Sequence, residues 1–109
     1  MTTFDERESA FENKYAHDAE MQFKAEARRN RLLGLWAAEK MGLSGDEAAA
    51  YAKAVVIADL KEAGDEDVYR KVKADFDAKG IAITEAELRK RMSDLRAEAK
   101  SQVMSEAGD

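Results

Sequence analysis

The sequence contains few side chains of the types that carry out catalysis. Its only histidine is His17, within the run HDAE, and it has no cysteine. A zinc hydrolase of the HExxH type needs two histidines four residues apart, and metal sites bridged by carboxylates in helical bundles need Glu-x-x-His pairs. Because neither pattern is present, we expect no catalytic residues and no metal site.

Carboxylates are abundant, but their abundance does not make a catalytic arrangement. Asp, Glu, Lys and Arg together make up 38% of the chain, so acidic side chains come near one another by chance. Acid and base catalysis needs two carboxyl groups whose pKa values are driven apart by their surroundings. We therefore interpret the acidic residues as solvated surface and expect that the protein is not an enzyme.

One stretch, KAEARRNR, is basic within an otherwise acidic chain. Two interpretations of its cations are open: a local anion-binding site, or a basic helix face that packs against the acidic faces of other helices. Trp36 lies a few residues further on and is expected to be part of the core, although an indole ring can also stack on adenine. The four cations of this stretch are Lys24, Arg28, Arg29 and Arg31.

The composition predicts a single, all-α domain. The chain has 109 residues, with no proline to break a helix and no cysteine for disulfides, and it is rich in the strong helix formers Ala, Glu, Lys, Arg and Leu. Its formal charge is -5, whereas nucleic-acid binding needs a basic excess. An acidic N-terminus without a long apolar run predicts a cytoplasmic protein that is not inserted in a membrane.

Glycines and capping residues divide the chain into four predicted helices. Gly42 and Gly80 are expected to end helices in the left-handed conformation, whereas Gly34 should interrupt its helix without breaking it. Helix starts are indicated at Ser44 and Thr84, each with a glutamate three residues later as in a capping box, and Asp65 is expected to cap a third start. The predicted helices run from about residue 18 to 41, from 44 to 64, from 65 to 80 and from 84 onwards.

The last predicted helix has a clear apolar stripe. Its apolar residues recur at intervals of three or four, which places them on one helical face, while charged residues fill the other faces. Short helices are marginal alone in water, so such stripes must meet in a bundle. We therefore predict a four-helix bundle over residues 19–109, with this stripe in its core: Leu88, Met92, Leu95, Ala99 and Val103.

Residues 1–18 differ from the remainder and form a predicted N-terminal arm. Residues 1–20 contain six acidic and two basic side chains, which is too polar for a core. The arm can nevertheless form a helix, because Thr3 and Glu6 match a capping box, and Phe4, Phe11 and Tyr15 fall near one helical face. Such a segment is typical of one that folds on a partner, or of a frayed helix that covers the bundle. We expect the arm to be flexible or partly helical.

The chain resembles a known family over the run FDERESAFENKYAHDAEMQFKAEARRNRLLGLWAAEKMG. This run is similar to the ζ subunits of alphaproteobacterial F-type ATP synthases, and the later helices match in pattern and length. The resemblance implies a four-helix bundle that inhibits ATP hydrolysis by the catalytic head of the synthase through its N-terminal region. The implied partners are the α, β and γ subunits of that head, with the arm at an α/β interface near the central rotor.

The arm also resembles the inhibitory stretch of the mitochondrial ATPase inhibitor. It departs from that stretch at Phe11, where the mitochondrial protein has an acidic residue, and at Ala16, where it has an aromatic one. The chain shows no long heptad repeat of the mitochondrial kind, so a shared mechanism is expected to be confined to the arm. The residues expected to bind the partner are Phe4, Arg7, Glu8, Phe11, Glu12, Lys14 and Tyr15.

The ζ family is associated with ADP and ATP, which implies a second function as a nucleotide sensor. The phosphates would then lie beside the basic stretch at Lys24, Arg28, Arg29 or Arg31. No cofactor is required for inhibition in either case. A helical adaptor unrelated to ATPases is the third reading. We expect a monomer when free, and a protein peripheral to the inner membrane when bound to the synthase.

Overall fold

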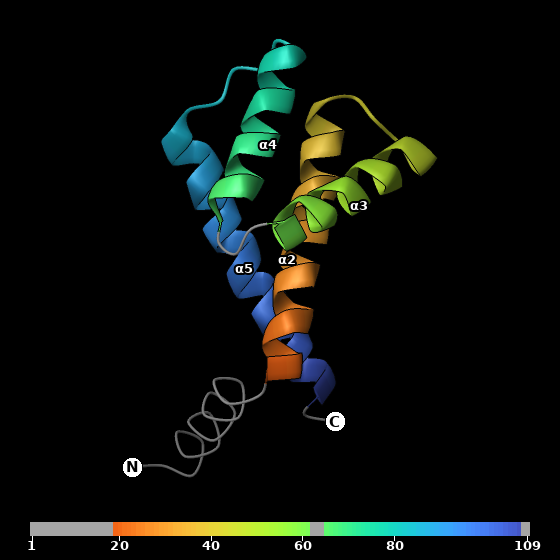
Figure 1. Ribbon diagram of the computed structural model, residues 1–109, viewed down its shortest axis with the longest axis vertical. Helices are drawn as coiled ribbons and strands as arrows, with labels where there is room; N and C mark the ends of the chain where they lie inside the picture. Colours follow the sequence, from red (N-terminus) through yellow and green to blue (C-terminus); the bar gives the residue numbers. More distant parts are fainter. Residues whose placement is uncertain (1–18, 62–64, 108–109) are drawn as a thin grey trace.

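The structure, a computed structural model, describes residues 19–61 and 65–107, which form four α-helices and, within these ranges, no strand (Figure 1). The helices are α2 (Ala19–Lys40), α3 (Gly45–Lys61), α4 (Glu66–Ala78) and α5 (Glu85–Ala107). The all-α class and the four helices predicted from the sequence are thus confirmed. The N-terminal arm, residues 1–18, lies outside the described residues.

Two helix ends follow the sequence prediction. Gly42 and Gly80 have positive φ angles of 79° and 73°, a conformation that an L side chain rarely adopts. After α2, the amide of Leu43 donates to the carbonyl of Ala38, and after α4 the amide of Ile81 donates to that of Phe76, both at 2.9 Å. This six-to-one pattern satisfies carbonyls that a helix end would otherwise leave without donors.

The helix starts agree with the prediction at one site of three. At α5, the Glu87 amide donates to Thr84 Oγ1 and the Thr84 amide donates to Glu87 Oε1, which completes the capping box. At α3, the side chains of Ser44 and Glu47 form no such pair; Gly45 adopts a φ of 56°, which changes the direction of the chain directly after Ser44.

The predicted cap of α4 is wrong in its mechanism. Asp65 does precede the helix, but its backbone is already in the right-handed helical region and its side chain accepts no hydrogen bond from the first turn. Its carboxylate instead contacts arginines of α2 and α5. Charged, long-range partners are stronger than a local amide donor, and they take the side chain away from the helix end.

The main core lies where all four helices meet. The predicted stripe of α5 is buried throughout, from Leu88 to Val103. Its N-terminal half packs with α2, α3 and α4, and Phe76 of α4 is fully buried there. Trp36 is half-buried against this cluster, with its ring centroid 5.7 Å from that of Phe76.

A second, smaller core joins the opposite end of α2 to the end of α5. Met21 and Ala25 of α2 pack with Val103 of α5, and Met104 covers them. In Figure 1 these two helices lie side by side and extend beyond α3 and α4. The start of α2, to which the arm is attached, is therefore held by α5.

Helices α2 and α3 approach each other closely at Gly34, in the middle of α2. A Cβ atom added at Gly34 would lie 2.5 Å from the Cα of Ala52 in α3, closer than any real contact. The two backbones can approach this far only because both residues are small. Gly34 is therefore needed for packing, which the sequence prediction of an interrupted helix did not anticipate.

Gly34→Ala should lower the free energy of unfolding by about 1 to 3 kcal/mol, because the added methyl forces α3 away from α2. Alanine intrinsically favours a helix over glycine by about 1 kcal/mol, so a net loss would identify the steric effect. Urea denaturation measures it, with Lys53→Ala on the exposed surface of α3 as the control. A variant as stable as the parent would contradict the close contact.

Candidate functional site

The four cations of the basic stretch point in different directions from α2. Arg29 is fully buried and lies on the side facing α4 and α5, where its Nη2 donates to Asp65 Oδ1 at 3.0 Å. Its Nε donates to Asn30 Oδ1 at 2.7 Å. Arg96 of α5 donates to the same Asp65 oxygen at 2.6 Å. The Asp65 carboxylate thus links α2 and α5 at the start of α4.

The charges at this junction favour the ionised form of Asp65. Burial by itself would raise the pKa of the Asp65 carboxyl. The charges of Arg29 and Arg96, together with their hydrogen bonds, outweigh this effect and hold the pKa below its usual value. Arg29 therefore stabilises the bundle, which agrees with the interpretation of a basic helix face packed against acidic partners.

The other three cations of the stretch line one cavity. This cavity, about 670 Å³ in volume, lies between α2, α3 and the end of α5. A second cavity of about 320 Å³ adjoins it on the other side of Phe23. We call the two together the Phe23 groove. Both halves are lined by Phe23, Ala27 and Val56. The larger half is also lined by Lys24, Arg28, Arg31, Leu32, Leu35, Gln102 and Glu106, and the smaller half by Glu26, Asn30, Asp59 and Leu60.

The three cations in the Phe23 groove differ in their partners. Arg28 forms a two-pronged ion pair with Glu106 of α5, which lowers the pKa of that carboxyl. Lys24 pairs with Glu20, 3.3 Å away, and both side chains are largely exposed. Arg31 is exposed, and it has no ion-pair partner among the residues that the structure describes. Lys24 and Arg31 are thus the more available positive charges.

The walls of the Phe23 groove include large apolar side chains that are exposed. Phe23 is 63% exposed and Leu60, across from it on α3, is 66% exposed. Ile57 and Leu35 are also exposed on the same two helices. Single apolar residues are common on surfaces, but a contiguous group marks an interaction site.

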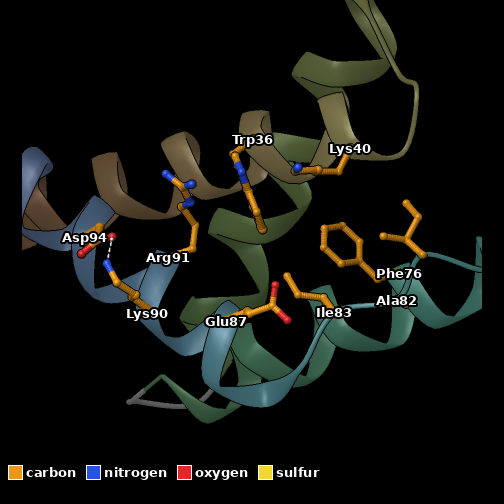
Figure 2. A pocket seen from close by; sticks show the side chains of 10 residues that line it. Trp36, Lys40, Phe76, Ala82, Ile83, Glu87, Lys90, Arg91 and Asp94 are labelled. Atoms are coloured by element: carbon orange, nitrogen blue, oxygen red, sulfur yellow. Dashed lines mark hydrogen bonds and ion pairs between the residues drawn. The ribbon is translucent and has the colours of Figure 1, made fainter.

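A separate cleft surrounds Trp36, between α2, α4 and the start of α5. Figure 2 shows the indole with Lys40 and Arg91 on either side of it, and Lys90 beside Asp94. The Arg91 guanidinium lies 5.3 Å from the ring centroid and the Lys40 ammonium 6.0 Å from it. The cleft has a volume of about 390 Å³. We call it the Trp36 cleft.

Sequence reasoning did not find the Trp36 cleft. It placed Trp36 in the core, and the ring does rest on Phe76. The cations around it come from α2 and α5, which are far apart in the sequence. No local pattern indicates such a combination, although an isolated Trp one turn before Lys40 was a partial signal.

The arm residues expected to bind a partner, from Phe4 to Tyr15, lie outside the described residues. Their geometry is therefore not part of the site. Within the described ranges, no group of three or more Asp, Glu or His residues is arranged to hold a metal ion. No described helix has the length and apolar character needed to cross a bilayer.

Comparison with known proteins gives the family of the chain. Residues 1–102 match the family model of the ATPase inhibitor subunit zeta. The chain therefore belongs to the family of ζ inhibitor subunits of ATPases, as its resemblance in sequence implied.

A solved structure is similar to this chain in sequence and in fold. A protein determined by solution NMR is 60% identical to this chain, with a TM-score of 0.69, and the match covers 79% of this chain and 98% of that one. A search of curated proteins gave no match.

Asp65→Asn should lower the free energy of unfolding at neutral pH by about 1 to 3 kcal/mol, because the buried Arg29 loses its charged acceptor. The folded-state pKa of Asp65 is below the unfolded value. Its contribution is therefore complete above about pH 4 and is lost as the pH falls through the folded pKa. The difference in the free energy of unfolding between Asp65→Asn and the parent should accordingly become smaller at acid pH.

Urea denaturation at pH 7 and at successively lower pH measures both effects. Glu39→Gln, an exposed change in the last turn of α2, serves as the control and should change stability by no more than about 0.5 kcal/mol. A difference that stays constant down to the acid limit would show that the Asp65 charge does not stabilise the fold.

Proposed function

We propose that this chain inhibits ATP hydrolysis by the catalytic head of the F-type ATP synthase, and that its arm inserts as a helix at an α/β interface near the γ rotor. The observation that carries the proposal is the extent of the family match. It begins at residue 1 and includes the whole arm as well as the bundle. The acidic, aromatic arm is thus within the region that matches an inhibitor family.

The physical character of the two parts supports a division of labour. Residues 1–18 have too few large apolar residues for a core, yet those they have fall near one helical face. Such a face can fill a cleft that opens and closes as the rotor turns, while the charges around it set orientation. The bundle, whose α2 begins directly after the arm, holds the arm at the target.

In this proposal the chain is not an enzyme, and it acts as a cytoplasmic monomer that becomes peripheral to the inner membrane when it binds the synthase. Its partners are the α, β and γ subunits, and nucleic acid is not among them. Arrest of hydrolysis would prevent the waste of ATP when the proton gradient collapses.

A second function, adenine-nucleotide binding, has a specific feature in its favour. The Trp36 cleft combines a half-buried indole ring with cations from two helices, Lys40 and Arg91. Adenine stacks on indole, and phosphates bind arginine and lysine. In the basic stretch, by contrast, Lys24, Arg28 and Arg29 are each paired with a carboxylate, and only Arg31 has no ion-pair partner among the described residues. We therefore place ADP or ATP in the Trp36 cleft, with the basic stretch as the rival position.

Phe11→Ala and Tyr15→Ala should each weaken inhibition at least tenfold, because they remove the large apolar area needed to offset the ordering of the arm. The melting temperature of the isolated chain should change little. Single charge changes such as Glu8→Ala should have smaller effects, since exposed ion pairs contribute about 0 to 1 kcal/mol.

The measurement is the rate of ATP hydrolysis by an alphaproteobacterial catalytic head, titrated with each purified variant. Asn13→Ala is the matched control, because residue 13 falls on the helical face opposite Phe11. If a chain that starts at Asp18 inhibits as well as the full chain, the inhibitory contacts lie in the bundle and the arm mechanism must be abandoned. If no variant, the parent included, affects hydrolysis, the protein is a helical adaptor of another kind.

Trp36 is the only tryptophan, so its fluorescence reports directly on the cleft. Titration with ADP or ATP should change the emission, and Arg91→Ala should raise the dissociation constant about tenfold, equivalent to about 1.4 kcal/mol. Arg31→Ala is the control for the rival position. A larger effect of Arg31→Ala would place the nucleotide in the Phe23 groove, and no response in fluorescence or chemical shifts at millimolar nucleotide would remove this function.

A further inference from the structure

The Phe23 groove is a surface feature of the described residues that neither the inhibitory function nor the Trp36 cleft explains. Phe23 of α2 and Leu60 of α3 both line its smaller half, and both are about two-thirds exposed at 63% and 66%. Val56 and Leu35 extend the apolar wall along the same helices. Exposure of such large apolar side chains to water is unfavourable in free energy, so a segment that packs on them would be stabilised.

The charges around the groove restrict what can cover it. Its larger half is bordered on α2 by Lys24 and Arg31, and Arg31 has no ion-pair partner in the described part of the chain. The smaller half contains Leu60 beside Asp59 and Glu26. A suitable occupant is therefore a segment with an apolar face and acidic side chains on the flank that meets α2.

The segment that precedes α2 has this chemistry. Residues 1–18 contain five acidic side chains against two basic ones, and Phe4, Phe11 and Tyr15 recur at offsets of seven and four. The segment ends at Ala19, one helical turn before Phe23. A tether this short gives an effective concentration of about millimolar, so even a weak contact would be well populated.

The segment is also long enough. The groove runs along α2 from Phe23 to Leu35, a distance of about 18 Å at 1.5 Å per residue. A reversal of about three residues before Ala19 leaves about 15 residues, which span about 22 Å as a helix and more if extended. Antiparallel to α2, such a segment would bring Phe11 level with the region of Phe23 and Glu6 level with Arg28.

We infer that, in the free protein, the N-terminal arm docks in the Phe23 groove, with Phe11 between Phe23 and Leu60 and its acidic side chains toward Lys24 and Arg31. The groove thus covers the apolar face of the arm until the arm binds its target. The docking itself is independent of the proposed function. Its consequence, competition between the groove and the ATPase for one apolar face, rests on that function.

Paramagnetic relaxation tests the docking on the full chain. The protein has no cysteine, so Thr3→Cys gives a single site for a nitroxide label. Methyl signals of Leu35, Val56, Ile57 and Leu60 are then compared with the label oxidised and reduced. We expect these methyls to lose more than half of their intensity when the label is oxidised.

Matched variants connect this effect to the groove. Phe23→Ser with Leu60→Ser, or Phe11→Ser in the arm, should reduce the relaxation enhancement at Leu35 and Val56 at least threefold. Lys53→Ser on α3 and Asn13→Ala in the arm are the controls and should leave it unchanged. Thermal melts confirm that each variant is folded, which is expected because Phe23 and Leu60 are mostly exposed.

Two outcomes would overturn the docking. Weak enhancement that none of the variants alters would show an arm that does not occupy the groove. Enhancement in a mixture of spin-labelled chains and separate isotope-labelled chains would show that a second copy occupies it. None of these measurements involves ATP hydrolysis, so failure of the docking is distinguishable from failure of the inhibitory function.

If both proposals hold, Phe23→Ser with Leu60→Ser should inhibit hydrolysis at a severalfold lower concentration than the parent, because the arm no longer has to leave its own groove. Equal potency, with the docking established by relaxation, would show that the groove and the ATPase do not compete for the arm.

Discussion

The contact between Gly34 and Ala52 is the constraint on which the arrangement of this bundle depends. It lets the backbones of α2 and α3 meet without an intervening side chain, at a distance where even one methyl group would not fit. A bulkier pair would move α3 away from α2 and loosen the core around Leu33 and Val55. Toward the start of α2, Phe23 and Leu60 of the same two helices are exposed and line the Phe23 groove.

Helix α2 connects every feature that bears on function. One of its faces enters the core, a second carries the Phe23 groove, and a third presents Trp36 and Lys40 to the cleft shared with α5. Its first residue follows the arm. The buried contact of Arg29 with Asp65 and the small core around Met21 and Val103 hold the first half of α2 to α5. The start of α2, which follows the arm in the sequence, is thereby held in the bundle.

In an inhibitor built in this way, the arm would have two binding sites: the target ATPase and the groove of its own bundle. The same few aromatic residues of the arm would serve the target and the groove, and the difference between those two binding free energies would determine how readily the arm is released. In the proposed docking, the acidic arm would lie against cations on α2. A nucleotide in the Trp36 cleft would bind α2 and α5 on a different face, and would bias the arm only through the position of α2 relative to α3 and α5. These proposals are consistent with a family of inhibitor subunits and need no catalytic group in the bundle.

Local sequence determined the features that depend on near neighbours. The helical class, the glycine-terminated ends at Gly42 and Gly80, the capping box at Thr84 and the buried stripe of α5 were all predictable, because each depends on residues within a turn or two. The role of the arm was indicated by family resemblance, and the arm residues lie outside the described residues. Only the tertiary structure decided the others. Asp65 does not cap α4 locally but pairs with two arginines that are distant in the sequence. Arg29, unlike the other cations of the basic stretch, is buried in an ion pair, and Gly34 is a packing contact with α3. The Trp36 cleft and the Phe23 groove likewise join residues from helices far apart in the sequence, and the side-chain types that make them become a site only where packing brings them together.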